Sequence, residues 1–224
     1  MQAGNRTYHS AGDLPEIVPV FPLTGALLLP GGRMPLNIFE PRYLEMIEAA
    51  MAGDRLIGMI QPALDDSRRA DGEPHLTTVG CLGRIISFAE SGDGRYLITL
   101  NGVCRFRLGE EVSRPSRPYR MAHVTPFAGD LKDDDRSEVD REALISAFQA
   151  FVEANEMEVD WRSVEQASTQ TLVNVLSMMS PYGPAEKQAL LEAPDLKSRA
   201  DTLVAITELL LAKVPEGSGS SKLQ

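Results

Sequence analysis

Short apolar segments separated by turn residues fill the first 127 residues, and this pattern predicts β structure. Pro19, Pro22 and Pro30 punctuate the first segments; because proline has no N–H for a strand ladder, we expect edge strands or barrel corners there. Turn sequences at Glu90–Gly94 and Asn101–Gly102 predict hairpins, since Asn and Gly tolerate the positive φ of a tight turn. Many short strands with such corners favour a barrel or sandwich. The expected strands are Glu16–Phe21, Ala26–Leu29, Leu56–Gln61, Gly80–Phe88, Arg95–Leu100, Val103–Val112 and Tyr119–Phe127.

A helical spacing of apolar residues interrupts the β pattern at Pro41–Met51. Its proline suits a first helical turn, and Gly53 follows its end. Apolar side chains recur every three to four residues, so we expect one face to plug a barrel end. The residues of that face are Tyr43, Met46, Ile47 and Ala50.

From Ser137 onwards the spacing is helical throughout. Arg141–Ala154 carries Leu144, Ala147, Phe148 and Phe151 on one stripe. A second helix is expected from Ser163 to about Ser180, opened by a capping box at Ser163–Gln166 and with Leu172, Val175, Leu176 and Met179 facing inward. Ala185–Glu192 and a helix N-capped by Asp195 complete a small bundle.

The two patterns together predict an α+β fold, β-rich first and helical afterwards. The expected divisions are a flexible N-terminus (1–13), a β-rich subdomain (14–128), an acidic linker (129–136), a helical bundle (137–214) and a disordered tail (215–224).

Composition and charge narrow the class of protein. Hydrophobic residues make up 43% and charged residues 24%, as in ordinary globular proteins. No apolar run is long enough to cross a membrane, and the polar N-terminus does not resemble a secretory signal, so we expect a cytoplasmic protein. Residues 1–120 hold 13 basic and 14 acidic residues, whereas residues 121–224 hold 9 and 18. This acidic balance disfavours nucleic-acid binding, which depends on neutralising phosphates.

Motifs that carry chemistry are missing from the sequence. Cys81 and Cys104 form no CxxC, and the three histidines are scattered, so we expect buried thiols in strands and no metal site. No P-loop, nucleophile elbow or HExxH is present, and all five lysines lie outside the β half. A hydrolase built on Ser168 or Ser177 has no supporting constellation. We therefore expect neither a cofactor nor catalysis.

The densest segment is Phe21–Tyr43 (FPLTGALLLPGGRMPLNIFEPRY). It predicts an apolar hairpin with a Pro-Gly-Gly turn, a second strand, and a helix whose N-terminal dipole Glu40 complements. We expect Glu40 to pair with Arg84 or Arg105. Two interpretations stay open: Glu40, Arg42 and Tyr43 either lock the helix to the barrel or contact a ligand.

This segment resembles the opening signature of the Lon N-terminal domain, in the residues FPL, LLPGG and PLNIFEPRY. Residues 57–62, 80–84 and 94–106 resemble the same family in order and spacing, so the resemblance covers about residues 14–213. It implies a PUA-like pseudo-barrel followed by a helical bundle. In full-length Lon proteases this module precedes an ATPase domain and a Ser–Lys protease domain. The sequence stops after the helices, so the resemblance implies a stand-alone bacterial form without catalytic residues, and a peptidase label would be inherited.

The resemblance therefore implies a non-catalytic polypeptide-binding module, as an adaptor or holdase for unfolded protein or as a partner of a Lon-type protease or another protein. Candidate substrate-binding residues are Leu28, Leu29, Met34, Phe39, Arg42 and Tyr43. Structural signature residues are Pro22, Pro30, Glu40, Pro41, Arg84 and Arg105. The alternative is a PUA-like small-ligand or RNA-binding module, which an arginine-lined groove of Arg84, Arg105 and Arg107 would favour.

Overall fold

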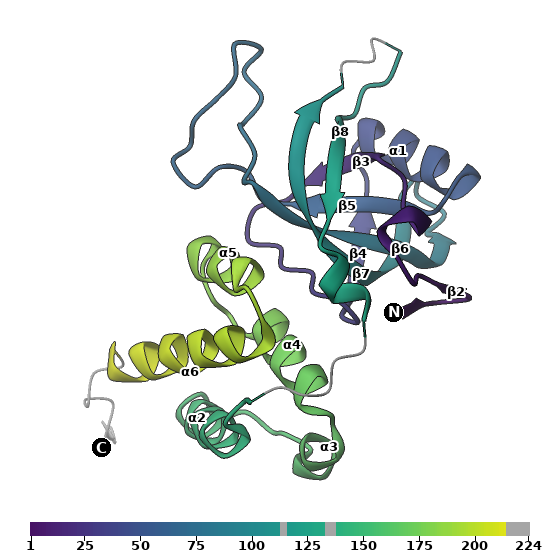
Figure 1. Cartoon of the computed structure of the whole chain (residues 1–224). Coiled ribbons are helices and arrows are strands. Elements are labelled where there is room, and N and C mark those ends of the chain that lie inside the picture. The colour runs from purple at the N-terminus through teal and green to yellow at the C-terminus, as the bar shows by residue number, and fades with distance from the viewer. Residues whose placement is uncertain (113–115, 133–137, 214–224) are drawn as a thin grey trace. The chain divides into compact units, whose positions relative to one another are not determined.

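A computed structural model of the chain describes residues 1–112, 116–132 and 138–213, shown in Figure 1. The described residues form a mixed α and β structure, as the α+β prediction states, and they divide into two compact units. The first, here the barrel unit, contains Met1–Asp135 and Asn174–Glu192; the second, the helical unit, contains Arg136–Val173 and Ala193–Gln224. The boundary crosses helix α4 (Thr169–Met179), so this division differs from the predicted bundle at 137–214.

Six strands form the main sheet of the barrel unit. They are β3 (Ile17–Pro22), β4 (Arg33–Ile38), β5 (Leu56–Ile60), β6 (Val79–Glu90), β7 (Tyr96–Glu111) and β8 (Met121–Pro126). Their order is β4-β7-β6-β5-β3-β8, and an additional pairing of β7 with β8 closes a ring of five strands that leaves β4 at an edge. β3 and β5 are parallel, and the other described pairs of this sheet are antiparallel.

The prolines of β3 are explained by a change of partner along the strand. Ile17–Pro19 pairs with β8, whereas Val20–Pro22 pairs with β5. Each proline therefore lies in a half-strand whose described ladder is on one side, where a residue that cannot donate a ladder hydrogen bond is tolerated.

Two predictions about strand boundaries were wrong. Ala26–Leu29 is not a strand, and β4 pairs with β7 rather than forming a hairpin with the segment before it. Asn101–Gly102 is not a turn but lies within the 16-residue β7. A Cβ on Gly102 would lie 2.1 Å from the carbonyl oxygen of Leu29, so this glycine lets two backbones cross. The turn predicted at Glu90–Gly94 is confirmed, with positive φ at both of its glycines.

The N-terminal residues have defined structure, in contrast to the flexible segment expected for 1–13. Two short strands, β1 (Gln2–Ala3) and β2 (Arg6–Thr7), precede a 3-10 turn, η1 (Ala11–Asp13). Ala3 and Tyr8 are fully buried in the barrel core. These two buried residues anchor the N-terminal segment on the barrel, although the average polarity of the segment gives no sign of it.

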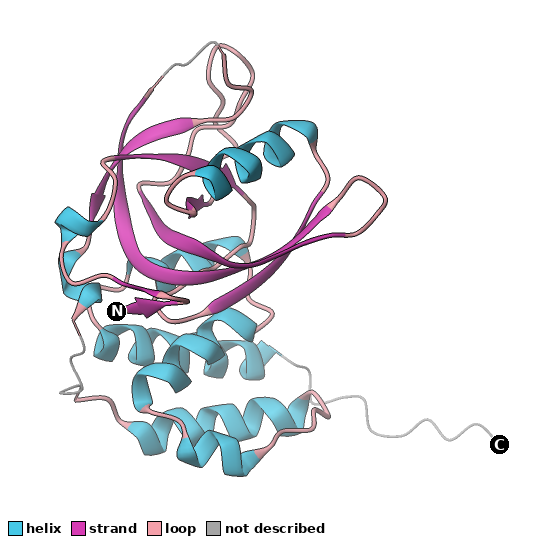
Figure 2. Cartoon of the chain, turned by 90° about the vertical axis from the view of Figure 1, so that its right-hand side faces the viewer, coloured by secondary structure: helices cyan, strands magenta, loops and turns pink. Residues whose placement is uncertain are grey.

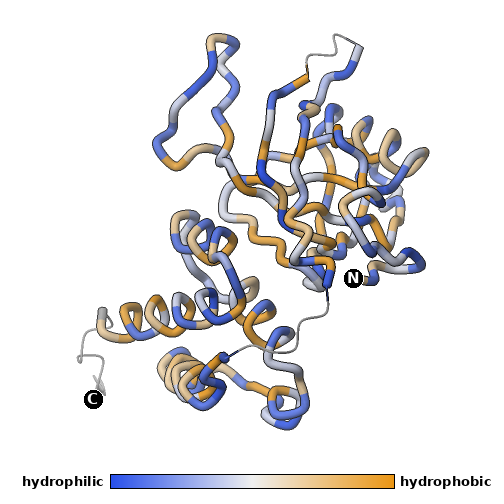
Figure 3. Tube along the Cα trace, viewed as in Figure 1, coloured by the Kyte–Doolittle hydropathy of each residue, from blue (hydrophilic) through white to orange (hydrophobic). Residues whose placement is uncertain are grey.

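The barrel core is formed mainly by inward residues of the ring strands, and Figure 3 shows hydrophobic positions recurring along these strands. Phe106 is fully buried, and a Cβ on Gly80 would lie 2.5 Å from its ring, so glycine makes room for the aromatic side chain. Cys81 and Cys104 are buried thiols in β6 and β7, as predicted, and neither forms a disulfide.

Helix α1 (Pro41–Ala52) runs alongside the curved strands of the barrel (Figure 2). All four residues predicted for its inner face are buried. Its Tyr43 ring packs on Phe21 of β3, with ring centroids 4.3 Å apart. The helical spacing of the sequence therefore located this face correctly.

Helix α5 (Pro184–Glu192) is tied to the barrel by buried amides. Gln61 Nε2 donates to Gln188 Oε1 at 3.1 Å and to the Pro184 carbonyl at 3.0 Å. Gln188 Nε2 donates in turn to the Val79 carbonyl at 3.1 Å. Gln61 Oε1 accepts from the Gly25 N–H at 2.8 Å. These bonds explain why α5 belongs to the barrel unit.

The helical unit contains α2 (Arg141–Ala154), α3 (Trp161–Gln166), the start of α4 and α6 (Leu196–Lys213), and α2 packs against α6. Asp160 caps α3 by accepting from the N–H groups of Arg162 and Ser163. The predicted helix from Ser163 to about Ser180 is therefore two helices, and its capping box is wrong because the helix begins before Ser163.

The inner face predicted for α4 was half correct. Leu172 and Leu176 are buried, whereas Val175 and Met179 are exposed. Val173 is buried instead, so the covered face is rotated from the one that apolar residues alone suggest. The predicted tail at 215–224 and the second half of the acidic linker, residues 133–136, lie outside the described residues.

Candidate functional site

Several kinds of chemistry find no support in the described residues. No helix of the described chain is both long and apolar enough to span a bilayer. Histidine, cysteine and carboxylate side chains nowhere gather in threes around a possible metal position in the described segments. Burial raises the pKa of the Cys104 thiol to about 12, with the charge of Asp130 adding to the effect, so this thiol stays protonated and unreactive.

The predicted substrate-binding residues are divided between core and surface. Leu28 and Leu29 are buried, and so is Pro30, which places them in the packing of the barrel unit. Met34 is half-buried on β4. Phe39, by contrast, is 62% exposed immediately before α1.

Phe39 and Leu97 are exposed apolar residues near the paired ends of β4 and β7, and together they are called here the exposed apolar surface. Leu97 of β7 is 48% exposed and lies in register with Asn37 of β4 and Ala89 of β6. The Arg95 guanidinium lies 5.9 Å from the centre of the Phe39 ring, two positions before Leu97. Phe39 directly follows the end of β4, two positions after Asn37, so the two exposed apolar residues lie near the paired ends of β4 and β7.

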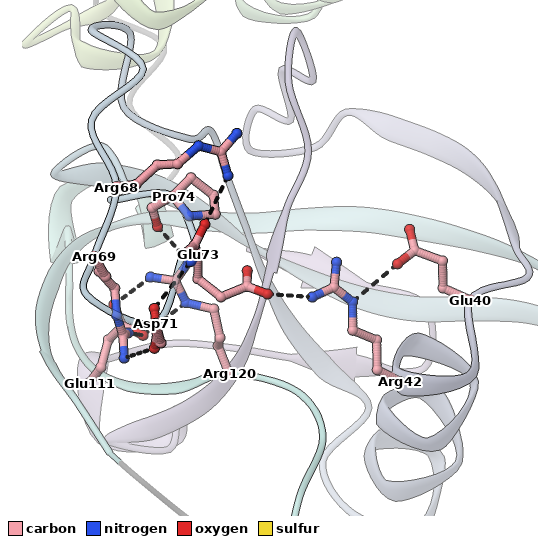
Figure 4. A network of polar contacts seen from close by, with 10 residues as sticks. Glu40, Arg42, Arg68, Arg69, Asp71, Glu73, Pro74, Glu111 and Arg120 are labelled. Atoms are coloured by element: carbon pink, nitrogen blue, oxygen red, sulfur yellow. Dashed lines mark hydrogen bonds and ion pairs between the residues drawn. The ribbon is translucent and has the colours of Figure 1, made fainter.

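Next to Phe39, the start of α1 joins an ionic network with the loop between β5 and β6 (Figure 4). Arg42 Nε donates to Glu40 at 3.1 Å, and its Nη1 donates to Glu73 at 3.0 Å. Glu111 of β7 accepts from Arg69 at 2.8 Å and from Arg120 Nε at 2.8 Å. The network thereby joins the start of α1, the loop between β5 and β6, the end of β7 and the residue before β8.

Two cavities adjoin this network, and both have Arg42 and Glu73 in their walls. One, of about 330 Å³, contains four arginines, two glutamates and the rings of Tyr43 and Tyr119. The other, of about 350 Å³, is lined by Thr24, Arg42, Pro62, Ala63, Asp66, Arg68, Gly72, Glu73 and Pro74. The loop that connects β5 to β6 contributes all of these residues except Thr24 and Arg42, and Figure 1 shows it projecting away from the barrel. The Arg42–Glu73 ion pair therefore contributes to both cavities.

Burial and charge shift the pKa values of two groups in the wall of the 330 Å³ cavity, Tyr43 and Glu111. Burial raises the pKa of Tyr43, although the adjacent Arg42 charge opposes the rise. Burial also acts to raise the pKa of Glu111, but its bond to Arg120 and the charges of Arg120 and Arg69 outweigh burial, so that pKa is lowered. Both groups are thus held in their neutral-pH forms, Tyr43 as the phenol and Glu111 as the carboxylate.

The expected partners of Glu40 were wrong. Arg84 donates to the Asp54 carbonyl at 2.7 Å and to the Tyr8 hydroxyl at 3.3 Å. Arg105 is buried and makes a bidentate pair with Asp130, at 2.9 and 2.8 Å. An arginine-lined groove of Arg84, Arg105 and Arg107 does not form, because Arg105 is buried with its own counter-ion. Pro22 and Pro41, the remaining signature residues, end β3 and begin α1.

Sequence reasoning missed most of the ionic network. Arg69, Glu73, Glu111 and Arg120 lie in or beside loops and strand ends, where an isolated charge indicates only a solvated surface. Their pairing depends on the loop between β5 and β6 folding back toward β8, and no local spacing encodes that contact. The helix start at Glu40–Arg42 was the one part with a usable signal.

Comparison with known proteins agrees with this fold. Residues 17–209 match the family described as the ATP-dependent protease La (LON) substrate-binding domain. The chain is 30% identical over 213 residues to Lon protease 2 of Myxococcus xanthus, covering 90% of this chain and 24% of that protein. It is 26% identical over 189 residues to the Lon protease of Desulfosudis oleivorans, covering 83% of this chain and 23% of that protein. The chain thus spans about a quarter of the length of these relatives.

Solved structures show the same fold. The Lon N-terminal domain protein from Xanthomonas campestris aligns with a TM-score of 0.61 at 24% identity, covering 84% of this chain and 97% of that one. The N-terminal domain of the Mycobacterium avium complex Lon protease aligns with a TM-score of 0.63 at 19% identity, covering 86% and 98%. The family match, extending over most of the chain and supported by this fold, shows that the protein belongs to the Lon substrate-binding domain family.

Proposed function

We propose that this chain binds exposed apolar polypeptide through the barrel unit and acts as a non-catalytic recognition module, either an adaptor or a holdase for unfolded protein. The observation that carries the proposal is the exposed apolar surface at Phe39 and Leu97, which are 62% and 48% exposed. Its family membership supports polypeptide as the ligand class.

The energetics of that surface favour a macromolecular partner. Complete burial of a fully exposed Phe or Leu side chain contributes about 1.5–3 kcal/mol, and about half of each residue is still exposed here. Covering both residues therefore contributes about 1.5–3 kcal/mol in total, a part of the roughly 8 kcal/mol of a micromolar affinity. Phe39 is positioned by the end of β4 and the start of α1, and Leu97 by the ladder of β7 with β4 and β6. Their fixed backbone reduces the ordering cost of binding.

The edge position of β4 favours side-chain recognition over strand addition. Pro35 lies within β4 and has no N–H to offer an incoming strand. A polypeptide client is therefore expected to bury its apolar side chains against Phe39 and Leu97 rather than extend the sheet.

The relatives suggest how such binding is used. They are named Lon proteases, and the matching region is about a quarter of each. We include in the proposal that the chain delivers clients to a Lon-type protease, or holds them for another partner, in the cytoplasm. Two buried cysteines outside any disulfide are consistent with a reducing compartment.

Aggregation of a chemically denatured client tests the holdase part of the proposal. Light scattering of the diluted client is followed with and without an equimolar amount of this chain. The proposal predicts suppressed scattering, and an unchanged time course would exclude the holdase. Binding without suppression would leave the adaptor role.

A further inference from the structure

The cavity of about 330 Å³ beside α1 has an excess of positive charge in its walls. Four arginines line it, against two glutamates. The arginines are Arg42, Arg69, Arg117 and Arg120. Glu40 and Asp71, which pair with Arg42 and Arg69, are not among the lining residues. The interior of the cavity is therefore more basic than the network as a whole.

Arg117 is the arginine of this cavity whose charge remains uncompensated among the described residues. Arg120 is held by both oxygens of Glu111 and by its bond to the Pro74 carbonyl at 2.8 Å. Arg42 and Arg69 each have carboxylate partners. Arg117 contacts only the Met121 sulfur, at 3.6 Å, and the Tyr119 ring, at 5.8 Å from its centre, within the described structure. Its guanidinium thus retains strong donors for an anion.

The rest of the cavity wall is apolar or aromatic. Tyr43 and Tyr119 contribute rings, and Pro22, Pro118, Val112 and Met121 contribute aliphatic surface. Its volume is at the small end of the range for ligand pockets, enough for about one or two residues of a peptide. The cavity therefore combines a cation with a small apolar compartment.

From this combination we infer that the cavity binds the C-terminal residue of a polypeptide, with the terminal carboxylate on Arg117 and an apolar last side chain against Tyr43 and Tyr119. A chain end fits a small cavity better than an internal segment does, because the chain leaves the cavity in one direction only. This inference rests on the proposed function and makes it more specific, since it adds a terminal anchor to the apolar surface at Phe39 and Leu97.

Two peptides of identical sequence test the inference. Both are labelled at the N-terminus and end in leucine; one has a free C-terminal carboxylate and the other a C-terminal amide. Fluorescence anisotropy with the full chain should show at least about tenfold tighter binding of the free acid, the difference that a charge-assisted hydrogen bond provides. A third peptide, amidated but with an internal glutamate, distinguishes a chain end from an internal carboxylate.

Arg117→Gln is the matched variant, because it removes the charge and retains polar length. It should weaken binding of the free acid by about tenfold and leave the amide unchanged. Arg107→Gln removes an exposed arginine outside the cavity walls and should preserve the preference for the free acid. Circular dichroism spectra of both variants that match the wild-type spectrum would show that folding is intact.

Equal binding of acid and amide, or equal loss for Arg107→Gln and Arg117→Gln, would overturn the inference. A preference for the internal glutamate over the free terminus would overturn the assignment to a chain end. Binding of an unfolded client without any preference for the free acid would leave the proposed function standing while this inference fails. A preference for the free acid without binding of an unfolded client would support this inference while the proposed function fails.

Discussion

Gln61 and Gln188 lie 127 residues apart in sequence, yet Gln61 Nε2 donates to Gln188 Oε1 at 3.1 Å in the interior of the barrel unit. Both side chains are buried, and their remaining amide atoms bond to backbone groups of the barrel and α5. A pair of fully bonded amides fixes α5 on the barrel more specifically than an apolar contact would, because any displacement leaves polar groups unsatisfied.

Replacing Gln188 with leucine should therefore destabilise the barrel unit. The Val79 carbonyl loses one of its donors and Gln61 loses an acceptor, at a cost of about 1–3 kcal/mol in the free energy of unfolding. Urea unfolding followed by circular dichroism measures this loss. Gln2→Leu, at an exposed position of the same unit, is the control and should change the free energy by less than about 0.5 kcal/mol.

Asp130→Ala should be more damaging, because it leaves the buried Arg105 guanidinium without its counter-ion. Removing one partner of a buried ion pair costs about 3–5 kcal/mol. Asp54→Ala removes the carboxylate of an exposed pair with Arg6 in the same unit and should cost less than about 1 kcal/mol. Equal urea midpoints for the two variants would show that the Arg105–Asp130 pair does not stabilise the fold.

Gly102→Ala tests the backbone crossing that replaced the predicted turn. The new Cβ would overlap the Leu29 carbonyl, so we expect a loss of about 1–3 kcal/mol or more in the free energy of unfolding. Gly129→Ala has open space around the added carbon and should be neutral or slightly stabilising. A neutral Gly102→Ala variant would mean that the crossing is looser than described.

The contrast between α1 and β7 shows what the sequence could reveal. The inner face of α1 was predicted correctly because helical spacing is a local pattern, repeated within 12 residues. Asn101–Gly102 was misread because the Asn-Gly rule is also local, whereas the reason for Gly102 is the distant Leu29 backbone. Local rules fail where a residue serves a contact between remote segments.

The candidate site shows the same limit. Phe39 and Arg42 lie in the recognisable segment before and within α1, and the structure brings them to an exposed surface and to the ionic network. Arg117 and Glu111 gave no signal, because a charge near a strand end is ordinary until its neighbours are known. Leu28 and Leu29 are apolar like Phe39 and were predicted with it to bind substrate, but they are buried. Exposure is a property of the fold rather than of residue type.

Acid should weaken the fold through Glu111. Its folded pKa is lowered, so its contribution to stability is complete above the ordinary value of 4.5 and is lost as pH falls through the lower, folded value. Glu111→Gln should therefore be less stable than the wild type at neutral pH and lose less stability on acidification. Glu110→Gln, at the exposed neighbouring position, retains the contacts of Glu111 and is the control. Parallel pH curves for Glu111→Gln and the wild type would contradict this account.

The central claim, that the exposed surface at Phe39 and Leu97 binds polypeptide, is tested most directly by anisotropy of fluorescently labelled, reduced casein at two salt concentrations. The wild-type chain should bind in the micromolar range with little dependence on salt. The double variant Phe39→Ser with Leu97→Ser should bind at least about tenfold more weakly at unchanged stability, in line with the burial energy of two such side chains. Leu209→Ser, at an exposed leucine of the helical unit, should bind like the wild type. Absence of casein binding by the wild type, or undiminished binding by the double variant, would contradict the claim.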